Sequence, residues 1–200
     1  MKKLLLFIAI IFFFTTMNSQ NNKALIIIDI QNDYFEGGAA PLVGTYEASS
    51  NAKILLDDFR KKNLPIIHIQ HIANREGATF FVPNTFGAEI HENVKPTEGE
   101  TLIIKHFPNS FRETDLQAAL KEKNITDLVI CGMMTSMCVD ATTRAAKDFG
   151  YNCTVISDAC AAPNLQLKDK TVKAEDVHNA FLAALSYYYA TVITTQEYIK

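Results

Sequence analysis

The sequence predicts an α/β protein with one open, mostly parallel six-stranded sheet and helices on both faces, in three layers. Two observations predict this class. Short apolar runs rich in β-branched residues alternate with longer segments whose apolar residues recur at helical spacing, as expected for parallel strands buried on both faces. The length of 200 residues, 48% hydrophobic and 20% charged, fits a single globular domain.

Each element follows from a local pattern. The expected strands are residues 24–30, 64–72, 101–105, 127–132, 152–157 and 190–194. The expected helices are residues 46–62, 113–123, 136–149 and 174–188. Gly150 directly follows the third helix, where glycine commonly ends a helix. Residues 73–100 show no periodicity, so we expect a long loop of the kind that often covers a substrate.

The first nineteen residues have the pattern of a secretory signal. Lys2 and Lys3 precede an apolar run at residues 4–14, and polar residues follow. Eleven helical residues rise about 16 Å, short of a bilayer core of about 30 Å. We expect residues 1–19 to be a signal peptide and residues 20–200 to be the mature domain, exported to the periplasm or secreted. The alternative is an uncleaved N-terminal anchor; after cleavage, no stable membrane anchor is expected.

Charge and cysteine content exclude several classes. The net charge is −3 and no run of basic residues is longer than three, so binding to nucleic acid is not expected. Four cysteines are too few for a disulfide scaffold, and no C-x-x-C redox motif occurs. The expected partner is a small-molecule substrate. The tyrosines at 187–189 are assigned to packing or to a subunit interface, which leaves a homo-oligomer open.

Three reactive side chains fall where ligands bind in such folds, beyond the carboxyl ends of the strands. Asp29 lies at the end of the first strand, Lys105 at the end of the third, and Cys138 at the start of the helix after the fourth. Each has an ordinary structural interpretation alone. Together they suggest a cysteine nucleophile, whose thiolate a helix N-terminus and a nearby cation would both favour, with a carboxylate to move the proton.

Three segments resemble the isochorismatase-like cysteine hydrolases, a superfamily that also includes the nicotinamidases. They are IIIDIQNDYF, IIKHFPNSF and GMMTSMCVDATTRAA, at residues 26–35, 103–111 and 132–146. The resemblance implies a Rossmann-like topology, Asp29 as general base, Lys105 as stabiliser of the thiolate and of the transition state, and Cys138 as nucleophile. It also implies a cis peptide between Met133 and Met134, with the backbone N–H groups of Met134 and Cys138 forming an oxyanion hole.

A second set of residues is assigned by position and by the same resemblance. The expected substrate-pocket residues are Gln31, Tyr34, His71, His106 and Phe111. Gln31 is also expected to hold the loops around Asp29. We assign structural roles to His68, Arg144 and His178. Cys131 and Cys153 are expected to be buried, and a disulfide between Cys138 and Cys160 is not favoured.

The sequence departs from the nicotinamidases at their metal site. They carry an Asp-x-His after the second strand, whereas here His71 stands at the Asp position and Ala73 at the His position. We therefore expect no metal and no cofactor. True isochorismatases cleave a vinyl ether and lack the nucleophilic cysteine. Cys138 instead predicts an exported cysteine hydrolase of an amide, lactam or ureido C–N bond. The alternatives are a nicotinamidase or isochorismatase-type hydrolase, or a catalytically silent binding protein of this fold.

Overall fold

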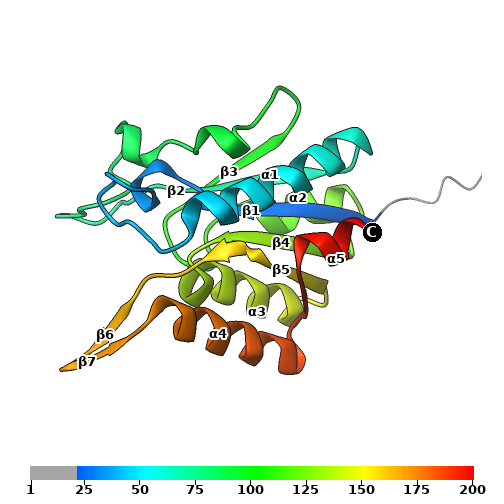
Figure 1. Ribbon diagram of the computed structural model, residues 1–200. Helices are drawn as coiled ribbons and strands as arrows, with labels where there is room; N and C mark the ends of the chain where they lie inside the picture. The colour runs from blue at the N-terminus through cyan, green and yellow to red at the C-terminus, as the bar shows by residue number, and fades with distance from the viewer. Residues whose placement is uncertain (1–21) are drawn as a thin grey trace, which may run out of the picture.

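A computed structural model describes residues 22–200 and contains a six-stranded sheet of order β3-β2-β1-β4-β5-β8 (Figure 1). All five strand pairings in it are parallel, which confirms the predicted fold class. The strands are β1 (Lys23–Ile28), β2 (Ile66–His71), β3 (Thr101–Lys105), β4 (Asp127–Met133), β5 (Asn152–Ala161) and β8 (Thr191–Ile193).

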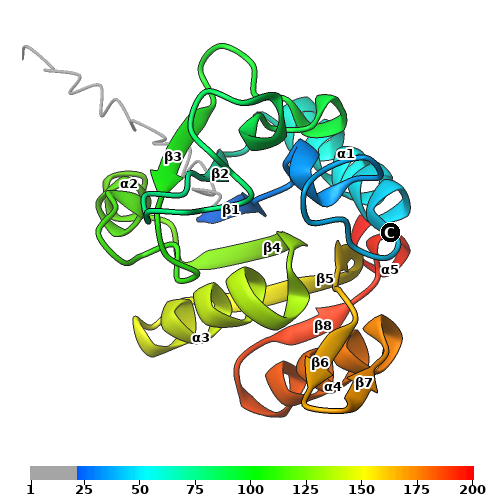
Figure 2. The ribbon, with the colours of Figure 1, turned by 90° about the vertical axis from the view of Figure 1, so that its left-hand side faces the viewer.

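The helices form a layer on each face of the sheet (Figure 2). Helices α1 (Thr45–Lys61) and α5 (Thr195–Ile199) pack on one apolar core, with Leu55, Phe59 and Tyr198 against it. Helices α2 (Leu116–Glu122), α3 (Asp140–Asp148) and α4 (Ala174–Tyr188) pack on the other, where Leu120 and Leu185 are buried. The alternating apolar faces of the strands therefore supply both cores.

The two central strands touch closely at Gly132. This residue pairs with Ile28 of β1 and has a φ of 131°. A Cβ at this position would overlap the Ile28 carbonyl oxygen. Only glycine combines that φ with that approach, so Gly132 allows β1 and β4, the strands that lead into Asp29 and Cys138, to lie at this separation.

Several elements differ from the sequence prediction. Helix α2 begins three residues later than expected, and the expected helix at residues 136–149 opens with a π-helical segment, Thr135–Val139, before α3. Strand β5 runs to Ala161, beyond the expected end at residue 157. The hairpin of β6 (Leu165–Leu167) and β7 (Lys170–Val172), and the short helix α5, were not predicted, because segments this short carry too few residues to show periodicity.

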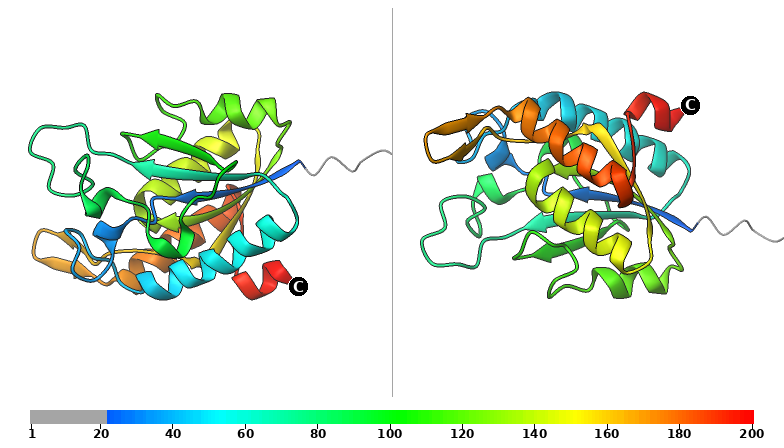
Figure 3. Two further views of the ribbon diagram at one scale, coloured as in Figure 1. Left: turned by 90° about the horizontal axis from the view of Figure 1, so that it is seen from above. Right: turned by 90° about the horizontal axis from the view of Figure 1, so that it is seen from below.

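The long loop expected at residues 73–100 is present. It contains only two single-turn 3-10 helices, Phe86–Ala88 and Glu92–Val94. This loop and the β6–β7 hairpin both extend beyond the same edge of the sheet (Figure 3).

Glu100 ties the end of this loop to the sheet. Its carboxylate accepts hydrogen bonds from Arg60 Nε at 2.7 Å and from the Thr97 N–H at 3.0 Å, and lies 2.8 Å from Nε2 of His68 on β2. Burial raises the pKa of Glu100, but the hydrogen bonds from Arg60, Thr97 and His68 outweigh it and hold that pKa at about 2. His68 thus has the structural role predicted for it.

We expect Glu100→Gln to destabilise the protein in a pH-dependent way. Because the folded-state pKa is below the ordinary value, the ionised carboxylate contributes stability above about pH 4.5, and this is lost as the pH falls toward 2. The free energy of unfolding should fall by about 1–3 kcal/mol at pH 7 and by clearly less at pH 3. Urea titrations measure both values. Glu98→Gln, at an exposed neighbour, is the control, and an equal deficit at both pH values would contradict the assignment.

None of the helices within residues 22–200 has the length and apolar character needed to cross a bilayer. The predicted signal peptide, residues 1–19, lies outside the described residues.

Candidate active site

The reactive side chains gather at the point where the strand order reverses. Beyond β1 the chain proceeds to β2 and β3 on one side, and it later returns to β4 on the other side of β1. Helices on opposite faces leave a crevice at such a switch point, at the carboxyl ends of the strands. Asp29 follows β1, Cys138 lies in the turn after β4, and Lys105 ends β3. The topology therefore brings together the three groups expected from the sequence.

Asp29 is fully buried and forms an ion pair with Lys105. The Lys105 Nζ lies 2.7 Å from Oδ2 of Asp29, and both side chains are 0% exposed. Among residues 22–200, neither carboxylate oxygen of Asp29 accepts a hydrogen bond of regular geometry. The backbone of Asp29 has a φ of 50°, in the left-handed region that aspartate tolerates better than most residues. The carboxylate is thus charge-compensated and still able to accept a proton.

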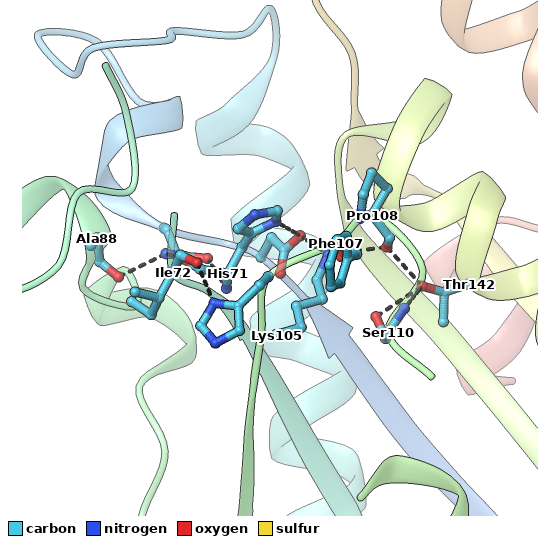
Figure 4. Close-up of polar contacts among 11 residues, drawn as sticks. His71, Ile72, Ala88, Lys105, Phe107, Pro108, Ser110 and Thr142 are labelled. Carbon is cyan, nitrogen blue, oxygen red and sulfur yellow. Dashed lines mark hydrogen bonds and ion pairs between the residues drawn. The ribbon is translucent and has the colours of Figure 1, made fainter. Parts of the chain in front are cut away.

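The ammonium group of Lys105 is held in place by backbone carbonyls. It donates to the carbonyl oxygens of Phe107 at 3.2 Å and Pro108 at 3.1 Å. Thr142 of α3 fixes this turn, since its hydroxyl accepts from the Ser110 N–H at 3.0 Å and donates to the Pro108 carbonyl at 3.4 Å (Figure 4). Burial lowers the pKa of Lys105, but Asp29 and Cys138 outweigh it, so that the pKa is raised. Lys105 therefore remains a cation.

Cys138 is buried, 3% exposed, within the π-helical segment Thr135–Val139. Its Sγ, the nearest oxygen of Asp29 and a ring nitrogen of His71 lie within 4.8 Å of one another. Burial and the charge of Asp29 raise the pKa of the Cys138 thiol, and Lys105 opposes them without prevailing. Burial, the largest cause, and the charge of Asp29 together outweigh the cation, contrary to the expectation that the site favours a thiolate. In this arrangement the thiol faces a carboxylate.

The peptide bond between Met133 and Met134 is cis, as the resemblance implied. The Met134 carbonyl accepts from the N–H groups of Met137 and Val139, while no acceptor for the Met134 N–H is found in the described part of the chain. The hydroxyl of Thr135 donates to the Ala161 carbonyl at 3.1 Å and lies 3.0 Å from Nδ1 of His178. These bonds anchor the turn that carries Cys138 to β5 and α4, and they give His178 its structural role.

A cavity of about 280 Å³ opens beside the three groups. Two of its lining residues adjoin the reactive groups: the Nδ1 of His71 lies 4.0 Å from Asp29 Oδ2, and Met137 is the chain neighbour of Cys138. Its walls are His71, Ala73, Asn74, Arg75, Phe80, Phe81, His106, Pro108 and Met137. A second cavity of about 330 Å³ lies between α1, β5 and α4 and includes Cys160 and His178. None of the three reactive groups lines either cavity, but the smaller one is bordered by the neighbours of Asp29 and Cys138, so it is the candidate substrate pocket.

Of the five expected pocket residues, only His71 and His106 line this cavity. Gln31 is fully buried and holds other segments: its amide donates to the carbonyls of His71 at 2.9 Å and Ala88 at 2.7 Å, and it accepts from the His71 N–H at 2.8 Å. It therefore positions β2 and the long loop, as expected for its second role, and does not form a wall.

The two aromatic residues expected in the pocket also lie elsewhere. Tyr34 is buried behind Phe81, with ring centroids 4.7 Å apart. Burial raises the pKa of Tyr34, and the charges of Cys138 and Asp29 raise it further, so its hydroxyl lies near the reactive groups. Phe111 packs against Phe149 and Tyr151 on the α2–α3 side of the sheet, and this packing directs it away from the cavity.

Asp33 was not singled out from the sequence, although it belongs to the segment at residues 26–35. Its carboxylate accepts from the Phe81 N–H at 2.6 Å and from the Ala39 N–H at 3.2 Å. A Cβ at Gly87 would overlap this carboxylate, so glycine is required there. Asp33 thus fixes Phe81, a wall of the cavity, in a segment whose sequence has no periodic signal.

The remaining sequence assignments concern cysteines and one arginine. All four cysteines are free thiols and buried, so Cys138 and Cys160 form no disulfide, as expected. Arg144 pairs with Asp140 at 2.9 Å and lies over the ring of Tyr189 at 4.5 Å. These contacts are structural, in agreement with the prediction.

Comparisons with known proteins agree with this geometry. The isochorismatase domain model matches residues 23–197. The isochorismatase family protein YddQ of Bacillus subtilis is 53% identical over 177 residues, 88% of this chain and 98% of that protein. The structure of an isochorismatase from Pseudomonas putida is similar, with 37% identity, a TM-score of 0.83 and coverage of 89% and 90% of the two chains. A cysteine hydrolase from Pseudomonas syringae has 25% identity, a TM-score of 0.84 and coverage of 89% and 91%. The chain belongs to the isochorismatase family of hydrolases.

Proposed function

We propose that this protein is an exported cysteine hydrolase that cleaves an amide, lactam or ureido C–N bond of a small molecule. The observation that carries the proposal is the buried set of thiol, carboxylate and ammonium at the β1–β4 switch point, with Asp29 and Lys105 2.7 Å apart and Cys138 beside them. An acyl-enzyme requires such a nucleophile, and the cavity admits a small substrate next to it.

In the first half of the proposed reaction, Cys138 is acylated. The thiol proton passes to the Asp29 carboxylate as sulfur attacks the substrate carbonyl and forms a C–S bond. The backbone N–H groups of Met134 and Cys138 donate to the resulting oxyanion; losing one such donor costs roughly 3–4 kcal/mol in other enzymes. When the intermediate collapses, the C–N bond breaks and the protonated Asp29 transfers its proton to the leaving nitrogen.

In the second half, water replaces the amine. Asp29 takes a proton from water as the hydroxyl adds to the thioester carbonyl, and the C–S bond then breaks. The sulfur recovers that proton, and the acid product leaves. Lys105 remains an ammonium group throughout and offsets the negative charge that passes between Asp29, sulfur and the oxyanion.

The alternatives differ in their chemistry. Vinyl ether hydrolysis, as in an isochorismatase, needs no nucleophilic thiol, and a nicotinamidase would need ligands that His71 and Ala73 do not reproduce. A silent binding protein would have no constraint to keep the three groups together. A substrate screen separates these hypotheses: ammonia release detects cleaved primary amides and ureido acids, and mass spectrometry detects opened lactams. Turnover only of isochorismate or nicotinamide, or of no compound in a broad panel, would contradict the proposal.

We further propose that the reaction needs no metal. The ligand atoms of Asp29, His71 and Cys138 lie close enough together to bind one metal ion. However, the Lys105 Nζ already lies 2.7 Å from Asp29 Oδ2, and this ammonium would repel a second cation. Turnover should survive exhaustive chelation unchanged. Activity that is lost on chelation and restored by one divalent metal would contradict this prediction.

Export is proposed on the pattern of Lys2, Lys3 and the apolar run at residues 4–14. Expressed with its full N-terminus in a bacterial host, the protein should be processed to a new N-terminus near Gln20. Edman sequencing of the periplasmic or secreted fraction measures this. A chain that starts at Met1 and stays in the cytoplasm would contradict the proposal.

A further inference from the structure

The walls of the candidate substrate pocket are chemically divided. Phe80, Phe81, Pro108 and Met137 give it an apolar side. His71, His106, Asn74 and Arg75 give it a polar side that carries basic groups. No carboxylate is among the residues that line it. Asp29, 4.0 Å from the lining residue His71, is already paired with Lys105.

Two exposed polar residues that line the cavity, Asn74 and Arg75, have side chains without a partner in the described part of the chain. Among residues 22–200, neither the Arg75 guanidinium nor the Asn74 amide makes an ion pair or a side-chain hydrogen bond. By contrast, Arg60 is bonded to Glu100 and Arg144 to Asp140. His106 is fixed by the Ile72 carbonyl, whose oxygen lies 2.7 Å from its Nδ1. That nitrogen therefore carries a proton, because a carbonyl only accepts.

The basic groups also affect the pKa of His71, which lines the pocket. Burial is the main cause that lowers the pKa of His71, and Asp29 opposes it. The charges of Lys105, His106 and Arg75 lower the His71 pKa further. Arg75 is therefore close enough to His71 to affect that pKa. Of the residues that line the cavity, Arg75 carries a permanent positive charge and none is a carboxylate, so the charge of the lining is positive.

We infer that the pocket selects anionic substrates: small amides or ureido compounds that carry a carboxylate, which Arg75 pairs with at the pocket mouth. This inference rests on the proposed function and names its substrate class. A guanidinium presents parallel N–H donors that fit a carboxylate. The volume of about 280 Å³ is at the small end for ligand sites, which favours a compact acid, and the aromatic side accommodates its carbon chain.

Alkylation of Cys138 tests the inference without a known substrate. Iodoacetate and iodoacetamide form the same C–S bond with loss of iodide, but only iodoacetate carries a carboxylate. Peptide mapping by mass spectrometry gives the rate of each reagent at Cys138. Relative to N-acetylcysteine under the same conditions, Cys138 should favour iodoacetate, and Arg75→Gln should lower its iodoacetate rate about 3–10-fold while the iodoacetamide rate changes less than about twofold. Added salt should reduce the preference.

Lys61→Gln is the matched control. It removes one positive charge from an exposed residue at the end of α1 and should leave the ratio of the two rates unchanged. If Arg75→Gln changes both rates equally or neither, or if Lys61→Gln lowers the ratio as much, Arg75 does not select the carboxylate and the inference is wrong.

A binding measurement separates this inference from the proposed function. In Cys138→Ala, which has no nucleophile, N-acetylglycine and N-acetylglycinamide differ only by the carboxylate. With Arg75 present, titration followed by NMR should show that N-acetylglycine binds about 3–10-fold more tightly than N-acetylglycinamide. With Arg75→Gln, the two compounds should bind equally. If Cys138 resists both alkylating reagents in the folded protein, the proposed nucleophile is wrong, and this binding ratio alone decides the charge preference. Equal binding of both compounds with Arg75 present would overturn it.

Discussion

Replacing Cys138 with serine should abolish nearly all turnover, by on the order of 10⁴-fold or more. A serine hydroxyl has a far higher pKa than a thiol, and the site already raises the pKa of the group at this position through burial and through Asp29. A neighbouring carboxylate is too weak a base to activate it. The measurement is kcat on a substrate found in the screen, with circular dichroism to confirm folding.

Cys153→Ser is the matched control for that variant. Cys153 is buried at the start of β5, where its thiol lies 3.9 Å from the Thr143 carbonyl and 3.8 Å from the Tyr151 carbonyl. Cys153 does not line the candidate pocket, so turnover of the folded variant should stay within about twofold of wild type. A folded Cys138→Ser protein that kept a tenth of the wild-type kcat would show that Cys138 is not the nucleophile.

Asp29→Asn should lower turnover by on the order of 10³-fold and yet make Cys138 easier to alkylate. Without the carboxylate, nothing takes the thiol proton during attack or returns it to the leaving nitrogen. The same change removes a negative charge that raises the pKa of the Cys138 thiol, and leaves Lys105 free to lower it. The thiolate fraction at pH 7–8 therefore rises, and iodoacetamide should react faster.

Lys105→Met removes the positive charge of the site. It should therefore shift the pKa of the Cys138 thiol in the direction opposite to that of Asp29→Asn. The pKa of Cys138 should rise above its wild-type value, because the Lys105 cation that lowers it is gone. The rate of iodoacetamide alkylation as a function of pH gives the pKa in all three proteins. Thermal unfolding checks that each variant is folded, since both leave one buried charge without its partner. If the two variants shift the pKa in the same direction, the electrostatic description of the site is wrong.

The fold was predictable because its signals are local. Apolar runs such as residues 24–30 can be buried only as strands covered on both faces, and the strand–helix alternation then brings their carboxyl ends to one edge. Asp29, Lys105 and Cys138 follow or end three of these strands, so they too were expected to lie together. The short β6–β7 hairpin carried no such signal, and its strands are exposed.

What the sequence could not supply depends on tertiary distances. The sign of the Cys138 pKa shift depends on full burial and on an ion pair that ties Lys105 to Asp29, and neither follows from spacing. Phe111 was expected in the pocket, but its packing partners Phe149 and Tyr151 come from a different part of the chain. Arg75 and Phe81 lie in a segment without periodicity, so only the folded loop shows that they reach the site.

The most direct test of the account is to capture the acyl-enzyme. A substrate from the screen is mixed with the protein, the reaction is quenched in acid within one turnover, and the peptides are mapped by mass spectrometry. The account predicts that the peptide with Cys138 gains the mass of the acyl group, that the adduct appears before free acid, and that Cys138→Ser shows neither adduct nor turnover. Rapid hydrolysis by a Cys138→Ser protein, or an adduct on any other residue, would contradict it.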